Sequence, residues 1–188
     1  MFFTALLLIV GIAVLFALWL VGQFNGLVQL RNQVQNAWAQ IDVQLKRRAD
    51  LIPNLVNTVK GVMKFEQDTL EKVMNARARA LGATSITERG AAEAELSQGI
   101  GRLLAVMENY PELKSNQNAL QLQEEVTATE NKVGFARQFY NDIVRKFNTA
   151  QQVFPGNLVA QMFGFQPSEF LAVPEADKAV PTVDLSLS

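Results

Sequence analysis

The first thirty residues constrain this chain most, because none of them is Asp, Glu, Lys or Arg. Within them, residues 2–21 carry Thr4 as their only clearly polar side chain. Twenty helical residues rise about 30 Å, which matches the thickness of a bilayer's hydrocarbon core. A cleaved signal peptide is the alternative, but the segment is long for one and lacks a basic n-region and a small-residue cleavage site. We therefore predict a transmembrane anchor over residues 1–22.

Basic residues flank this segment on its carboxyl side only. Arg31 is the first of them, and Lys46, Arg47 and Arg48 follow further along the chain. Because Lys and Arg close to a span favour the cytoplasmic side, we expect the amino terminus outside and the rest of the chain in the cytoplasm. The sequence thus predicts a single-pass protein of the inner (cell) membrane whose first partner is the lipid bilayer.

The composition of the chain disfavours most catalytic chemistry. Its 188 residues include no His and no Cys, so Cys/His zinc sites, iron–sulfur clusters, disulfides and Ser-His-Asp or Cys-His nucleophiles cannot form. With 17 basic and 18 acidic side chains the formal charge is −1, and this balance argues against nucleic-acid binding. We expect no enzymatic activity, no catalytic or metal site, no cofactor, no nucleic acid and no small-molecule substrate.

Carboxylates on two of the predicted helices are the remaining candidates for chemistry. They are Glu66, Asp68 and Glu71 on one helix and Glu124, Glu125 and Glu130 on another. A di-metal site in a helical bundle adds Glu-x-x-His motifs from two helices, which a chain without His cannot supply. We interpret these carboxylates as solvated helix surface.

Apolar residues beyond the anchor recur at alternating steps of three and four, which is the period of a helix seam. The first seam comprises Val34, Trp38, Ile41, Leu45, Ile52, Leu55, Val59 and Val62, and Arg48 fills its remaining position. No Pro separates this seam from the anchor, so we predict one continuous helix from about Phe3 to Asp50. Pro53 predicts a kink rather than a loop, because the seam resumes in phase after it.

Three further long helices follow in the sequence. The second is predicted from about Glu66 to Leu81, where Gly82 would supply a left-handed stop. Ser85 and Glu88 form a capping box that opens the third helix. The apolar face of this helix is predicted to comprise Ala92, Leu96, Ile100, Leu103 and Met107.

The third helix is predicted to end at Pro111, because the residue before a proline avoids helical angles. The fourth helix is predicted from about Asn116 to Val153. Four amphipathic helices with short links predict an all-α fold, an antiparallel up-and-down four-helix bundle with a left-handed twist over residues 23–154.

The end of the chain divides into two predicted segments. Residues 155–171 form a short amphipathic, aromatic segment that begins as a helix capped by Asn157. Its aromatic side chains could lie in the membrane interface, cover the base of the bundle or pack on a neighbouring subunit; they include Phe163, Phe165 and Phe170. Residues 172–188 form an extended tail in which apolar and polar residues alternate as in a strand. The apolar residues of this tail, which we expect to dock on a neighbouring subunit, are Val183, Leu185 and Leu187.

The seams also predict an ion pair within the bundle. If Phe24 lies level with Val153 in antiparallel helices, Arg48 lies beside Glu130. A buried Arg48 without a partner would be heavily penalised, and removing Glu130 alone would cost about 3–5 kcal/mol. The same register sets Trp38 opposite Phe139 and Tyr140, and Asn36 opposite Asn141, and we predict Trp38 with Tyr140 and Asn36 with Asn141 as structural pairs.

Two blocks of sequence resemble the bacterial LemA family. The first is residues 36–48, NAWAQIDVQLKRR, followed by DLIPNLV from Asp50. The second includes YPELK from Tyr110, TENK from Thr129, ARQFYN from Ala136 and FNT from Phe147. The resemblance covers about residues 1–165, and it implies one membrane-spanning helix, a cytoplasmic antiparallel bundle and no established enzymatic activity. Residues 62–66 depart from the family pattern, which has aromatic residues and a His there.

These observations lead to a functional hypothesis. We expect a non-enzymatic, membrane-anchored scaffold or adaptor of the bacterial envelope that forms homo-oligomers or engages other envelope membrane proteins. The alternative is a regulatory accessory subunit of a membrane enzyme such as a protease, which would use a face of the bundle rather than a pocket.

Overall fold

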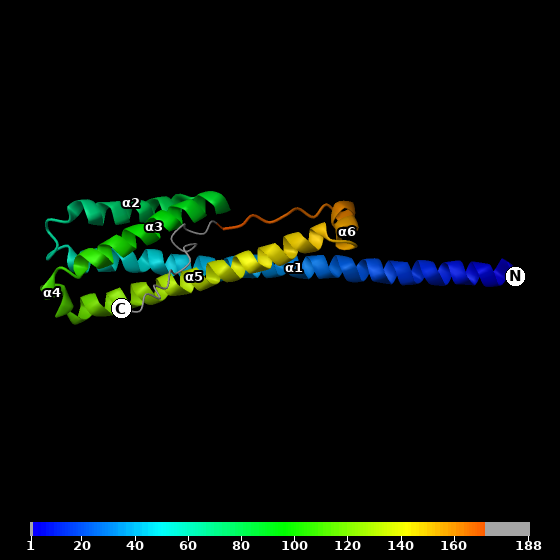
Figure 1. The fold of residues 1–188 in the computed structure, drawn as a ribbon, viewed down its shortest axis with the longest axis horizontal. Helices are drawn as coiled ribbons and strands as arrows, with labels where there is room; N and C mark the ends of the chain where they lie inside the picture. Colours follow the sequence, from blue (N-terminus) through cyan, green and yellow to red (C-terminus); the bar gives the residue numbers. More distant parts are fainter. Residues whose placement is uncertain (1, 172–188) are drawn as a thin grey trace, which may run out of the picture. The chain divides into compact units, whose positions relative to one another are not determined.

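The computed structural model describes residues 2–171, and the regular structure in that range is helical (Figure 1). The helices are α1 (Phe2–Val59), α2 (Gln67–Gly82), α3 (Ile86–Met107), α4 (Pro111–Lys114), α5 (Gln117–Gln152) and α6 (Gly156–Phe163). This confirms the prediction of an all-α chain. The predicted extended tail, residues 172–188 with Val183, Leu185 and Leu187, lies outside the described residues.

The described chain divides into two compact units, which we consider separately. The first unit contains the residues up to Asp42 together with Gln138–Glu169. The second contains Val43–Arg137, to which Phe170 and Leu171 belong as well. Helices α1 and α5 contribute residues to both units.

The long first helix is uninterrupted, as predicted. α1 runs from Phe2 to Val59 and includes Pro53. Its apolar start, from Phe2 to Val21, exposes nearly all of its large side chains, and the most apolar 18-residue window of the helix has no buried residue. This is the one helix among the described residues that is long and apolar enough to cross a membrane.

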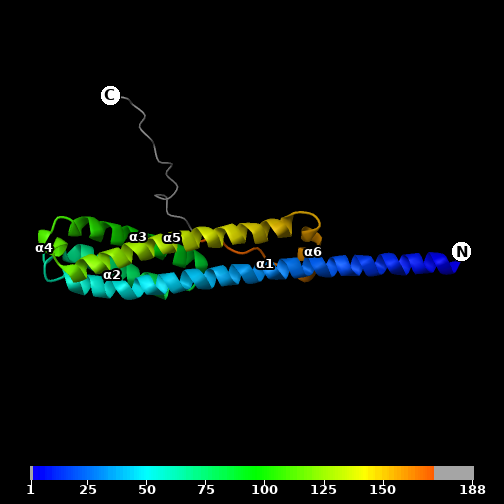
Figure 2. The ribbon, with the colours of Figure 1, turned by 90° about the horizontal axis from the view of Figure 1, so that it is seen from below.

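In the first unit, α6 packs on the part of α1 that follows the apolar start (Figure 2). The contact consists of Leu20, Phe24, Leu27, Ala150, Val159, Ala160 and Phe165. Two glycines permit this arrangement. A Cβ on Gly156 would collide with the carbonyl oxygen of Ala150, and Gly164 ends α6 at a φ of 69°, a left-handed conformation that other residues rarely adopt.

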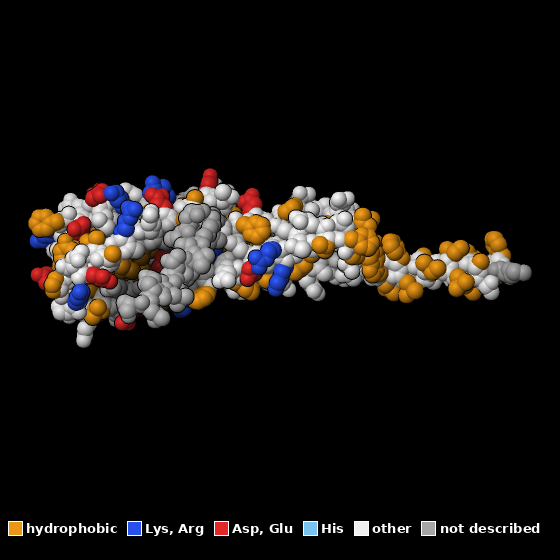
Figure 3. Space-filling model, in the orientation of Figure 1, with side chains coloured by type: hydrophobic (Ala, Val, Ile, Leu, Met, Phe, Trp, Pro, Cys, Tyr) orange, Lys and Arg blue, Asp and Glu red, His pale blue; other side chains and the backbone are white. Residues whose placement is uncertain are grey.

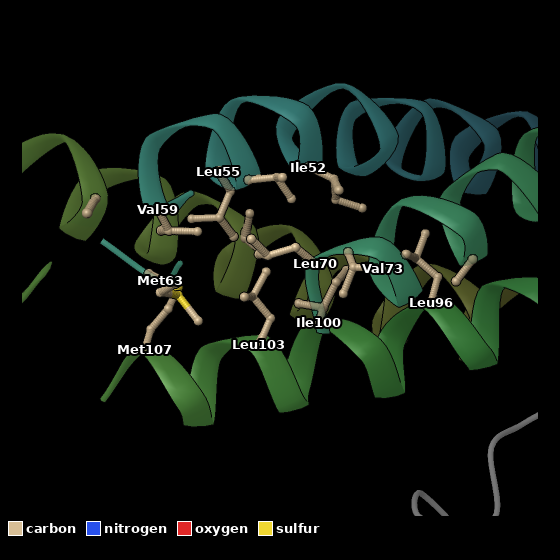
Figure 4. Packing of buried hydrophobic residues seen from close by; sticks show 14 of the residues in the cluster. Ile52, Leu55, Val59, Met63, Leu70, Val73, Leu96, Ile100, Leu103 and Met107 are labelled. Atoms are coloured by element: carbon tan, nitrogen blue, oxygen red, sulfur yellow. The ribbon is translucent and has the colours of Figure 1, made fainter. Parts of the chain in front are cut away.

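The core of the second unit lies between α1, α2, α3 and the start of α5 (Figure 4). The labelled side chains of Figure 4 point toward one another from three of these helices and from Met63: Ile52, Leu55, Val59, Leu70, Val73, Leu96, Ile100, Leu103 and Met107. Ala119 and Val126 add the contribution of α5. The apolar steps of three and four therefore mark the buried face of each helix.

Helix ends were predicted less well than helix interiors. Gly82 remains inside α2 and has no left-handed angle; the helix ends because Ala83 takes an extended conformation. α3 ends at Met107, four residues before the predicted stop at Pro111. Pro111 is instead the first residue of the short helix α4, a position where the missing N–H costs nothing. Asn157 lies within α6 rather than before it.

Candidate functional site

The most unusual feature of the second unit is a fully buried arginine. Arg48 lies on α1 between the buried residues Leu45 and Ile52. Its Nη1 donates hydrogen bonds to both carboxylate oxygens of Glu130, at 2.7 and 2.9 Å, and to the Ser97 hydroxyl at 2.7 Å. The structure thus brings together the two residues that the helix register had paired.

A second carboxylate, which was not predicted from the sequence, also binds Arg48. We call Arg48, Glu93, Glu130, Ser97 and Arg89 the ion cluster. Glu93 on α3 pairs with Nη2 of Arg48 and is itself buried. The Ser97 hydroxyl, one turn further along α3, donates to Glu130 at 2.9 Å. Arg89 approaches the other oxygen of Glu93 at 3.4 Å. Two cations therefore face two carboxylates, which offsets the cost of removing these charges from water.

The signal for Glu93 was present in the sequence. Glu93, Leu96, Ile100, Leu103 and Met107 follow the same steps of three and four that place Arg48 on its own seam, and all five are buried. The sequence analysis instead assigned this seam position to the neighbouring Ala92, because an apolar residue was expected there. A charged residue in phase with a seam should have been read as the partner of the charged residue in the other seam.

The carboxylates considered for a metal site do not converge. Among residues 2–171, no three His, Cys, Asp or Glu side chains lie where they could hold a metal ion together. Glu66 lies 3.5 Å from the Tyr110 hydroxyl, and Asp68 pairs with Lys72 at 2.5 Å on the surface of α2. Glu130 is half-buried in the ion cluster, so its interpretation as solvated helix surface was wrong.

In the first unit, the predicted aromatic pair is in contact. The rings of Trp38 and Tyr140 meet edge to face, with centroids 5.5 Å apart. The Tyr140 hydroxyl donates to the backbone carbonyl of Glu169 at 2.9 Å. Burial first, and the nearby charge of Glu169 second, raise the pKa of Tyr140 above its ordinary value. Asn36 is exposed and Asn141 half-buried, and their pairing stays a prediction.

The segment after α6 is fastened to α5 by reciprocal hydrogen bonds. The Asn148 side-chain amide donates to the Ser168 carbonyl, and the Ser168 N–H donates back to the Asn148 Oδ1, both at 2.9 Å. Phe165 is half-buried, 5.7 Å from the Phe24 ring and 6.4 Å from the Phe147 ring between centroids. Phe165 therefore packs within the chain rather than in the membrane interface or on a neighbouring subunit, which were the alternatives for this segment. Asn148 was not predicted as a site residue, because a single polar residue near a helix end has no distinctive spacing.

The other two aromatic residues predicted for an interface remain accessible. Phe163 is half exposed, although its ring lies 4.8 Å from that of Phe24. Phe170, which belongs to the second unit, is also about half exposed.

Comparison with known proteins identifies relatives along most of the chain. The profile of the LemA family matches residues 37–185. Protein LemA of Metamycoplasma hominis is 30% identical over 85% of this chain and 73% of its own length. Two proteins of Paramagnetospirillum magneticum, magnetosome proteins MamQ 1 and MamQ 2, are each 23% identical over 92% of this chain and 73% of their own length.

Proposed function

The chain belongs to the LemA family, and we propose that it is a non-enzymatic, membrane-anchored helical scaffold that self-associates in the bacterial envelope. The observation that carries this proposal is the apolar start of α1, residues 2–21, where nearly all of the large side chains are exposed. Such a surface needs an apolar surrounding, and its length fits a bilayer.

The proposed orientation follows from the first charged residue. Arg31 lies nine residues after Gly22, on the carboxyl side of the apolar start, and no charged residue precedes it. We place the amino terminus outside and the remainder of the chain in the cytoplasm, on the inner membrane.

For the architecture we propose a left-handed, antiparallel four-helix bundle built from α1, α2, α3 and α5. The seam spacing supports this handedness, since steps of three and four favour helices crossing at about +20°. The ion cluster supports a fixed register, because Arg48, Glu93 and Glu130 come from three helices and a shift of any one would leave a buried charge unpaired.

Purification of the full chain in mild detergent, followed by mass measurement, tests the scaffold proposal. We expect an intact chain that retains residues 1–22 and forms a discrete homo-oligomer. Loss of the first residues from the mature protein would indicate a signal peptide instead, and a monomer would contradict self-association. A membrane enzyme that co-purifies in a fixed ratio would favour the accessory-subunit alternative.

A further inference from the structure

Helix α6 carries an apolar surface that the packing of the first unit leaves uncovered. Val159 and Ala160 form its buried side, against α1. Leu158 and Met162, one turn apart on α6, leave 52% and 66% of their surface exposed, and Phe154, in the turn just before the helix, leaves 77% exposed. We call these three residues the α6 stripe. The helix is therefore apolar on two sides, and only one of them is satisfied by the chain itself.

Contacts with α1 give the depth of α6 relative to the proposed membrane span. Leu20, Phe24 and Leu27 pack against α6, and the Phe163 ring at its end contacts Phe24. If the span ends near Val21, the headgroup layer beyond it is about 5–7 Å thick, which corresponds to roughly four helical residues. Phe24 then lies at headgroup depth, and so does α6.

The charge distribution of the first unit matches this depth. Residues 147–168 contain no Asp, Glu, Lys or Arg, as is also true of residues 1–30. These two segments, far apart in sequence, pack together at α6. In Figure 3 hydrophobic side chains gather around α6 and along the apolar start of α1, and no charged side chain is visible there. A charged side chain in this region would raise the free energy of placing α6 in the headgroup layer, because the charge would have to be partly removed from water.

Arg31 marks the far boundary of this uncharged region. Its guanidinium lies 5.5 Å from the centroid of the Phe165 ring, and it is the first charged residue of α1. It lies about 10 Å further along the helix than Phe24, on the water side of the headgroup layer, where a charged side chain stays solvated.

We infer that the α6 stripe lies in the interfacial layer of the same bilayer that α1 crosses, as a second membrane contact. The inference rests on the proposed membrane anchor. A single transmembrane helix can rotate about its axis, whereas an interfacial helix packed against it holds one side of the first unit to the lipid. Trp19, half exposed on the last turn of the apolar start, is suited to the same layer.

Depth-dependent fluorescence quenching tests this inference on the full chain. Because the sequence has no Cys, a single introduced Cys carries a unique NBD label. We would label Met162→Cys for the α6 stripe, Ile12→Cys for the middle of the span and Phe135→Cys as an exposed apolar control in the second unit. Each labelled chain is placed in phosphatidylcholine/phosphatidylglycerol vesicles containing lipids with nitroxides at a shallow or a deep acyl position.

We expect shallow nitroxides to quench the Met162→Cys label more than deep nitroxides do. Deep nitroxides should quench the Ile12→Cys label more than shallow ones do. Neither kind of nitroxide should quench the Phe135→Cys label. Quenching at Ile12→Cys without quenching at Met162→Cys would overturn the inference and leave the anchor intact. A blue-shifted but unquenched Met162→Cys label would also overturn it, since a protein surface such as a second copy would then cover the stripe. Absence of quenching at Ile12→Cys would refute the anchor and the inference together. Leu158→Cys repeats the test if the Met162 variant does not fold.

Discussion

Arg48 shares its guanidinium between two carboxylates that differ in exposure. The side chain of Glu93 is 4% exposed and that of Glu130 is 23% exposed. This sharing changes the expectation drawn from the sequence, because loss of Glu130 no longer leaves Arg48 without a partner. The buried Glu93 becomes the more costly residue to remove.

We therefore predict an order of destabilisation within the ion cluster. Arg48→Met leaves two neighbouring carboxylates without their shared cation, and Glu93→Ala leaves Arg48 with a partly solvated partner; each should cost about 3–5 kcal/mol. Glu130→Ala should cost about 1.5–3 kcal/mol, the range for a hydrogen bond to a charged group. Thermal unfolding followed by circular dichroism measures the order. Glu130→Ala as the most damaging variant would contradict this account.

We predict that the folded chain loses stability at alkaline pH because the Tyr140 hydroxyl deprotonates. Because burial raises its pKa in the folded chain, its contribution is complete below the unfolded pKa of about 10 and is lost as pH rises through the folded value. Tyr140→Phe should lower stability by about 1 kcal/mol at neutral pH, through loss of the hydrogen bond to Glu169. It should also flatten the decline above pH 10. The pKa of Tyr110 is raised as well, by burial and by Glu66, so Tyr140→Phe is compared with the parent in a Tyr110→Phe background. A decline above pH 10 that Tyr140→Phe leaves unchanged in that background would contradict the assignment.

At the scale of helices, a periodic pattern predicted interiors better than ends. Repeated apolar steps are averaged over many residues, so all four long helices were found, although α1 continues to Val59, nine residues beyond the predicted Asp50. An end depends on one or two backbone conformations instead. Gly82 can take a left-handed angle but is not required to, and Pro111 is compatible with either ending a helix or beginning one. The partner of Arg48 was found through helix register, whereas Glu93 was missed because its own seam was assumed to be apolar throughout.

The turn from α5 into α6 depends on a glycine, and this gives a prediction with an internal control. Gly156→Ala places a methyl group against the carbonyl of Ala150, so the backbone must shift and we expect a clear loss of stability, about 1–3 kcal/mol. Gly134→Ala, within α5 and with open space around its Cα, should instead stabilise by about 0.5–1 kcal/mol. Chemical denaturation of both variants in detergent compares them. If Gly156→Ala and Gly134→Ala changed the free energy of unfolding equally, the contact between residue 156 and the Ala150 carbonyl would not contribute to stability.

The capping box at the start of α3 gives a prediction for acidic pH. The backbone N–H groups of Thr84 and Ser85 donate to Glu88 and lower its pKa. The contribution of Glu88 is therefore present above its unfolded pKa and is lost as pH falls through the folded value. Glu88→Gln should make α3 less sensitive to acid. Ser85→Ala removes the other half of the box at a cost of about 1 kcal/mol. Amide exchange at the first turn of α3 reports both effects, and unchanged exchange in Ser85→Ala would contradict them.

On the scale of the whole molecule, the account depends on a retained span with the rest of the chain in the cytoplasm. The sequence predicted the span because hydropathy and length are properties of composition that need no tertiary contact. The register that sets Phe24 level with Val153 also brings the segment after α5 to the end of the apolar start, where α6 packs. The sequence left open whether its aromatic side chains pack within the chain, in the membrane interface or on a neighbouring subunit. The ion cluster and α6 thus serve different needs: one fixes helix register, and the other lies where the chain meets the proposed membrane.

The most direct measurement is the accessibility of single Cys residues in intact cells to a membrane-impermeant maleimide. The chain has no native Cys, so Phe2→Cys reports the amino terminus and the exposed Phe135→Cys reports the second unit. We predict that Phe2→Cys is labelled from outside and that Phe135→Cys is labelled only after the membrane is opened. Labelling of Phe135→Cys in intact cells, or a mature protein that has lost residue 2 and its label, would contradict the account.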